Sequence, residues 1–261
     1  MLFRSLIEQW EMMFPEAARL LHRTGNYLYE RGQYMEAEPL YRRAVSIREQ
    51  VLGSDHPDVA GIFNDLAMLY YFQGKYEHAE PFHQRARIIF ECALGPTHHN
   101  VATSLNNLGK LYLAQGRYEA ARALMQRALA IREQVQGLDH PDVANSLHHL
   151  ADLAAAQGKY SEAEELYRRA LAMREQSLGL IHPDVAETLH KWAKLCHAQG
   201  REEEAELLFR RALSIREQIL GAKHPALAAT LEAYADLLRK TGRETEAASL
   251  EGRARVCLGR D

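Results

Sequence analysis

Histidine is the residue type in this chain best suited to bind a metal or to move protons, and the chain contains 13 of them. Five follow one another at intervals of 42 residues: His56, His98, His140, His182 and His224. One ring per interval places these side chains too far apart to share an ion, because zinc–nitrogen bonds are about 2.0–2.1 Å long. We therefore predict that each of the five helps to start a helix.

A second group of histidines could instead form a metal site: His148, His149, His190 and His197. These residues would project from neighbouring helices and could approach one another. No cysteine and no fixed ligand spacing accompany them. We expect no metal ion and no other cofactor.

Arginines recur with the same interval and could form a ridge that binds phosphate or nucleic acid. One series is Arg43, Arg85, Arg127, Arg169, Arg211 and Arg253, and a second is Arg48, Arg132, Arg174 and Arg216. Glutamates recur beside them at Glu49, Glu91, Glu133, Glu175 and Glu217, and the formal net charge is −3. Because the positive charge is compensated, we predict ion pairs between repeats on a solvated face for both series, and no nucleic-acid partner.

Catalysis is the function class with the least support. No glycine-rich phosphate loop follows a strand, and no serine or cysteine nucleophile motif is present. The three cysteines, Cys92, Cys196 and Cys257, are scattered, which is typical of a reducing compartment. No stretch approaches the roughly 20 apolar residues that span a bilayer. We expect a cytoplasmic, monomeric protein that is not an enzyme and does not contact membranes.

The elements that position these residues repeat every 42 residues. Glycines mark the repeat at Gly32, Gly74, Gly116, Gly158, Gly200 and Gly242. Each interval reads as two helices, for example Pro57–Phe72 and Tyr76–Ala93, and no alternating run argues for a strand. Small residues recur on facing sides of the two helices, as at Ala67 and Ala79. Stacked pairs can bury such a stripe, whereas one pair cannot.

These features resemble the tetratricopeptide repeat, and the phrase HPDVANSLHHLADLAAAQGKYSEAEELYRRALAMREQSLG resembles the kinesin light chain type of that repeat. The resemblance implies an all-α fold, a right-handed α-solenoid of stacked antiparallel helix pairs. We expect six repeats over residues 15–261, starting near residues 15, 57, 99, 141, 183 and 225. Residues 1–14 would form a capping helix or part of a further repeat.

The resemblance also implies that the first helix of each pair lines a concave groove. Carrying the family's inward positions onto this chain predicts a peptide-binding groove formed by Tyr29, Asn64, Met68, Tyr71, Asn106, Lys110, Leu113, His148, His190 and Lys194. We expect a scaffold that binds a protein or peptide partner there. The alternative is a regulatory or sensor array of a larger signalling ATPase, docked against its own chain.

Overall fold

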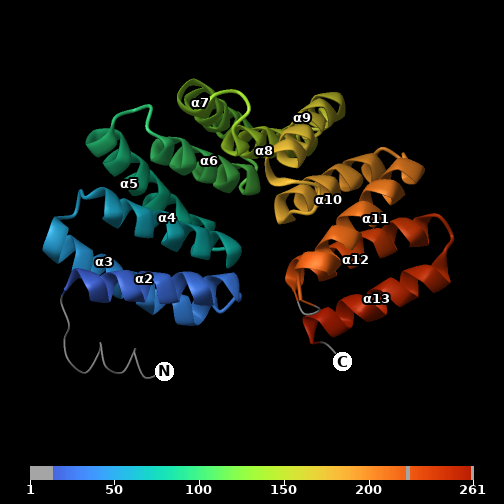
Figure 1. Ribbon diagram of the computed structural model, residues 1–261, viewed down its shortest axis with the longest axis horizontal. Coiled ribbons are helices and arrows are strands. Elements are labelled where there is room, and N and C mark those ends of the chain that lie inside the picture. The colour runs from blue at the N-terminus through green and yellow to red at the C-terminus, as the bar shows by residue number, and fades with distance from the viewer. Residues whose placement is uncertain (1–13, 222–223, 260–261) are drawn as a thin grey trace. The chain divides into compact units, whose positions relative to one another are not determined.

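The computed structural model describes residues 14–221 and 224–259, and every regular element in these ranges is an α-helix. The helices are α2 (Pro15–Glu30), α3 (Tyr34–Leu52), α4 (Pro57–Phe72), α5 (Tyr76–Leu94), α6 (His99–Ala114), α7 (Tyr118–Gln136), α8 (Pro141–Ala156), α9 (Tyr160–Leu178), α10 (Pro183–Ala198), α11 (Glu202–Ile219), α12 (Pro225–Lys240) and α13 (Glu244–Leu258). Successive helices form antiparallel pairs (Figure 1), which confirms the predicted all-α fold of stacked helix pairs.

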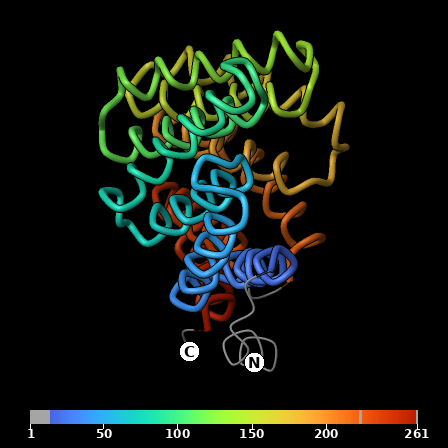
Figure 2. The backbone as a smooth tube through the Cα atoms, turned by 90° about the vertical axis from the view of Figure 1, so that its left-hand side faces the viewer, coloured from blue at the N-terminus to red at the C-terminus, as the bar shows by residue number. Residues whose placement is uncertain are grey.

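The chain divides into two compact units, residues 1–135 and residues 136–261, with the division at the end of α7. We call them the amino-terminal unit and the carboxy-terminal unit. In the amino-terminal unit, blue to green in Figure 2, short turns connect consecutive helices. The segment expected to form a capping helix lies almost entirely in residues 1–13, outside the described residues.

The histidine series starts the first helix of five of the six described pairs, as predicted; the first helix of the remaining pair, α2, has Phe14 as its N-cap. His56 is the N-cap of α4, and its ring Nδ1 accepts a hydrogen bond from the backbone N–H of Asp58 at 3.1 Å. The equivalent rings of His98, His140, His182 and His224 cap their helices in the same way. Pro57 occupies the first turn, where a proline's missing N–H costs no helical hydrogen bond.

Within a pair, the two helices approach closely at small residues. A Cβ atom on Gly109 of α6 would lie 2.7 Å from Met125 Cγ of α7, and one on Gly25 of α2 would lie 2.7 Å from Tyr41 Cε1 of α3. The Met125 and Tyr41 side chains fill the space beside these glycines, so a larger residue at either position would force the facing side chain to shift. Ala67, at the same position of α4, is fully buried.

The two arginine series behave differently. Arg85 pairs with Glu49 at 3.2 Å and Arg127 with Glu91 at 2.8 Å, and these side chains are partly exposed. Both bonds link second helices of consecutive pairs, so the prediction of ion pairs between repeats on a solvated face is confirmed for this series.

The prediction of a solvated face is wrong for members of the second series. Arg174 and Arg216 are each only 3% exposed. Their guanidinium groups reach across to the first turns of α10 and α12, where Arg174 Nη1 donates to the carbonyl oxygen of Asp184 at 2.8 Å and Arg216 Nη1 to that of Ala226 at 2.7 Å. The bonds still join one repeat to the next, but they do so in the interior.

Candidate functional site

The first helices of the amino-terminal unit are α2, α4 and α6. We call their exposed side the first-helix face. A hollow of about 420 Å³ opens on this face between α4 and α6. Its lining includes Gly61 and Asp65 from α4, Asn100, Thr103 and Asn107 from α6, and Phe90 from α5. It is large enough to take a side chain of a partner.

Two ion pairs form the side of the hollow toward the amino terminus. His22 Nε2 lies 2.5 Å from Asp65 Oδ2, which joins α2 to α4. Arg48 Nη1 lies 3.2 Å from Asp58 Oδ2 and 3.1 Å from the Asp58 carbonyl oxygen, which joins α3 to α4. Each of the two carboxylates that line the hollow therefore has one cationic or ionisable partner.

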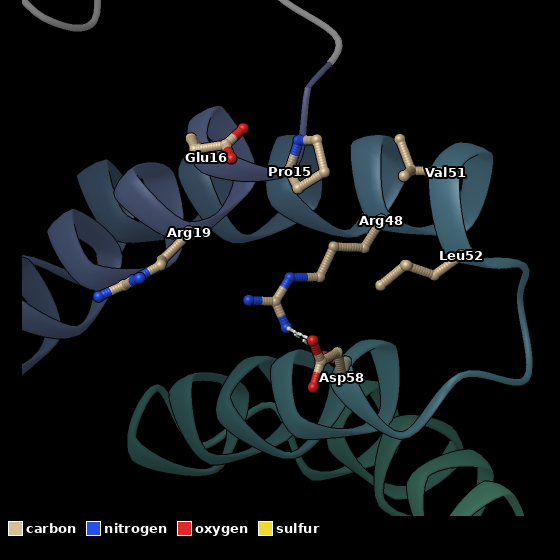
Figure 3. A pocket seen from close by; sticks show the side chains of 7 residues that line it. All are labelled: Pro15, Glu16, Arg19, Arg48, Val51, Leu52 and Asp58. Carbon is tan, nitrogen blue, oxygen red and sulfur yellow. Dashed lines mark hydrogen bonds and ion pairs between the residues drawn. The ribbon is translucent and has the colours of Figure 1, made fainter.

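Arg48 also borders a second hollow of about 220 Å³ at the amino-terminal ends of α2 and α4. Figure 3 shows the guanidinium group of Arg48 directed from α3 toward Asp58. Glu16 and Arg19 of α2 also line this hollow. Arg48 and Asp58 thus line both hollows.

Polar side chains hold the helices together beneath the larger hollow. Asn64 Nδ2 of α4 donates to Ser104 Oγ of α6 at 2.8 Å, and His83 Nδ1 of α5 donates to Asn64 Oδ1 at 2.9 Å. All three residues are buried. Burial lowers the pKa of His83 to about 3, with a smaller contribution from the charge of Lys110, so this ring is neutral at pH 7.

Five aromatic side chains gather at the carboxyl ends of α2 and α4, and we call them the aromatic cluster: Tyr29, Tyr34, Tyr71, Phe72 and Tyr76. The Phe72 ring is central, with centroids 5.8 Å from Tyr29, 6.2 Å from Tyr34 and 5.3 Å from Tyr71. Tyr76 contacts Tyr71 at 5.7 Å. Phe72 is 51% exposed, so the cluster presents an aromatic surface to solvent.

Five of the predicted groove residues are associated with this region. Tyr29 and Tyr71 belong to the aromatic cluster, Lys110 Nζ lies 5.8 Å from the centroid of the Tyr71 ring, and Met68 and Leu113 are partly exposed. Lys194 is exposed in the carboxy-terminal unit.

The other four predicted groove residues, Asn64, Asn106, His148 and His190, are buried. Their shared position was predicted to line the groove, but the structure turns it toward the neighbouring helices; of the four, Asn64 still lines the hollow. Thr188 of α10 lies beside the ring of His148, with Oγ1 3.4 Å from Nδ1, and His190 packs edge-on against Phe209. Burial lowers the pKa of His148 and of His190 to about 4.

Several residues that line the hollow together with Asn64 were not predicted as groove residues, among them Gly61, Asp65, Asn100, Thr103 and Asn107. Gly61 and Asp65 lie six and two residues before the small crossing residue Ala67, positions not included among the inward ones. A signal was nevertheless available in the sequence, because Phe90 occupies a position that is arginine in four other repeats.

Two structural features bear on other functions. Within the described ranges, no three histidine, cysteine, aspartate or glutamate side chains lie close enough together to hold a metal ion. No described helix has both the length and the apolar character needed to cross a membrane.

Comparison with known families gives a match over most of the chain. A profile described as tetratricopeptide repeat matches residues 16–91, 59–134, 100–176 and 184–255, and a second profile with the same description matches residues 148–218. The matched segments cover nearly all the described helices.

Solved structures with a similar fold include repeat proteins of the kinesin light chain type. A protein of Podosopora anserina, described as a kinesin light chain with nearly identical tetratricopeptide-like repeats, is 26% identical, with a TM-score of 0.61 over 78% of this chain and 97% of that one. BtubC, or BKLC, of P. vanneervenii is 19% identical, with a TM-score of 0.65 over 88% and 90%. A Rap protein in complex with Competence and Sporulation Factor is 13% identical, with a TM-score of 0.70 over 94% and 75%.

One curated relative is similar over a short segment. It is a nucleotide-binding leucine-rich repeat-like protein of Hyaloscypha variabilis, 43% identical over 56 residues, which is 20% of this chain. The chain spans only 6% of the length of that relative.

Proposed function

The chain belongs to the tetratricopeptide repeat family, and on this basis we propose that it is a scaffold that binds a peptide segment of a partner protein on the first-helix face of its amino-terminal unit. Proteins of this family are in general interaction modules, not enzymes. A micromolar dissociation constant, about −8 kcal/mol, would suit a reversible contact of this kind.

The observation that carries the proposal is the aromatic cluster at the carboxyl ends of α2 and α4. Its central positions, Tyr71 and Phe72, correspond to Ala155 and Ala156 in the carboxy-terminal unit, two repeats further along the chain. Packing within the repeat therefore does not require aromatic rings there. A half-exposed aromatic surface can anchor a peptide, because rigid rings contribute large contact areas.

We expect Phe72→Ala, and Tyr71→Ala to a similar degree, to weaken partner binding by about 2 kcal/mol, roughly thirtyfold, because aromatic anchors dominate binding energies. Phe72 is half exposed, so its truncation should change the melting temperature little. The measurement is quantitative mass spectrometry of proteins captured by the immobilised chain, wild type against variant.

Ile88→Ala is the matched control, because Ile88 is also 51% exposed but belongs to a second helix, α5. The partner should be lost with Phe72→Ala and kept with Ile88→Ala. Equal capture by all variants would place binding away from the aromatic cluster.

The second candidate function is a regulatory or sensor array within a larger signalling ATPase. It is favoured by the similarity to a nucleotide-binding leucine-rich repeat-like protein, although that similarity covers 56 residues only. In this case the first-helix face would dock against another part of the same polypeptide. Finding an upstream reading frame continuous with Met1 that encodes a nucleotide-binding domain would favour it over the first candidate.

A further inference from the structure

In the carboxy-terminal unit, the arginine at one position of the second helix of a pair has a fixed set of hydrogen-bond partners. This arginine is Arg174 in one repeat and Arg216 in the next. Arg174 donates to the Asn145 side-chain oxygen, 29 residues earlier, at 2.5 Å. It also donates to the carbonyl oxygen of Asp184, ten residues later, at 2.8 Å, and to the hydroxyl of Thr188, 14 residues later, at 2.5 Å. The guanidinium group is thus held by three acceptors at fixed offsets in the sequence.

Arg216, one repeat later, has the same arrangement. Its guanidinium group donates to the Glu187 carboxylate 29 residues earlier, to the carbonyl oxygen of Ala226 ten residues later, and to the hydroxyl of Thr230 14 residues later. The repeat therefore builds a guanidinium site between consecutive helix pairs and fills it with its own arginine.

In the second repeat, which lies in the amino-terminal unit between the repeats of Arg48 and Arg132, the same position is Phe90, so this repeat lacks the arginine. The three partner positions are Gly61, Asn100 and Ser104. Phe90, Gly61 and Asn100 all line the 420 Å³ hollow. A Cβ atom placed on Gly61 would meet no atom within 4 Å, so the acceptor side chain is also missing and the space is open.

The groups around this hollow suit a cation that donates several hydrogen bonds. The Asp58 and Asp65 carboxylates line it, against one permanent cation, Arg48, and the ring of His22. Within the described ranges, the carboxamides of Asn100 and Asn107 make no hydrogen bond to another protein group. Phe90 also lines the hollow but is only 4% exposed, so only a small part of its ring is available for a guanidinium group to stack on.

We propose that this hollow is a guanidinium-binding site that an arginine side chain of the partner fills in trans. The inference rests on the proposed function and adds the chemistry of the ligand: a peptide with an arginine. A carboxylate is less suitable, because the basic groups that line the hollow, Arg48 and His22, are already bonded to Asp58 and Asp65. Lysine would supply the charge but not the planar set of donors that the neighbouring repeats accommodate.

The test uses two short peptide probes, acetyl-Gly-Ala-Arg-Ala-Gly-amide and the same peptide with citrulline, which keeps the shape of arginine and loses its charge. Binding to the ¹⁵N-labelled chain is followed by NMR. We expect the arginine peptide to shift the Gly61 amide and the Asn100 and Asn107 carboxamide signals, with a dissociation constant on the order of 1 mM, while citrulline leaves them unchanged. Equal shifts from both peptides, or none from either, would overturn the proposal.

Substitutions at Gly61 give the sharpest result, because the proposal requires opposite signs at one site. Gly61→Glu restores the carboxylate that Glu187 supplies to Arg216 and should tighten arginine-peptide binding about tenfold, as one charge-assisted hydrogen bond would. Gly61→Arg places a guanidinium group in the hollow and should abolish binding. Weaker binding by both variants would show steric blocking only and would contradict the assignment.

Gly252→Glu is the matched control, because Gly252 is also a helical glycine with open space around its Cβ position, in α13. It should leave peptide binding unchanged. If the arginine peptide fails while Phe72→Ala removes a captured partner, the guanidinium site is wrong and the scaffold function stands. If the arginine peptide binds as expected but no partner is captured, the site stands and the scaffold proposal fails.

Discussion

Ala128→Arg should unfold much of the amino-terminal unit. Ala128 is completely buried in α7, where that helix packs on α6 so closely that Gly109 has no room for a Cβ atom. Overpacking a core costs about 1–3 kcal/mol, and an unpaired buried charge adds about 3–5 kcal/mol, comparable with the whole stability of a small domain. Circular dichroism should show a large loss of helix at 25 °C.

Ala130→Arg is the control for this substitution. Ala130 is exposed on the same helix, so the same change of residue adds no buried charge there. Its melting curve should match that of the wild type. If Ala128→Arg also melts like the wild type, the assignment of the small-residue stripe to the helix-crossing position is wrong.

The second large effect is loss of stability in acid. The pKa values of His83, His148 and His190 are lowered to about 3, 4 and 4, mainly by burial. An unfolded chain binds protons at these residues near pH 6.5, whereas the folded chain does not. Stability from the three histidines is therefore complete above about pH 6.5 and is lost as the pH falls toward 4, by about 1.4 kcal/mol per histidine per pH unit.

Denaturant unfolding between pH 7 and pH 4.5 measures this slope. His83→Gln should reduce the slope by about 1.4 kcal/mol per pH unit, because a neutral amide can still bond to Asn64 but takes up no proton. His78→Gln, at an exposed residue of the same helix, should leave the slope unchanged. An unchanged slope in His83→Gln would mean that this ring already binds a proton in the folded chain.

The helices were predictable from sequence because capping and turn residues repeat with them. The helix predicted for Pro57–Phe72 has those bounds in the structure, and the one predicted for Tyr76–Ala93 ends one residue later, at Leu94. Histidine before the first helix and glycine after it determine where the helix starts and stops, and these signals are local.

The candidate site was less predictable because exposure depends on neighbouring pairs. The family's inward positions predict that Asn64 and His148 line an exposed groove. Each instead lies beside a hydroxyl side chain about one repeat later, Ser104 and Thr188 respectively, and is buried with it. The glutamates that recur beside its series predict a solvated face for Arg174, although it is buried and bonds to three acceptors on other helices. Asn64 and Ser104 are 40 residues apart in the sequence, and so are His148 and Thr188. The acceptors of Arg174 lie up to 29 residues away from it. Helical periodicity within one element does not identify them.

Hydrogen exchange measured by mass spectrometry, on the chain alone and with a captured partner, tests the central claim most directly. The claim is that a peptide binds on the first-helix face of the amino-terminal unit. We predict that the partner slows exchange in α4 and α6 and in the turn after α4, with the outer surface of α9 and α11 unchanged. Protection confined to the second helices, or to the carboxy-terminal unit, would contradict the claim.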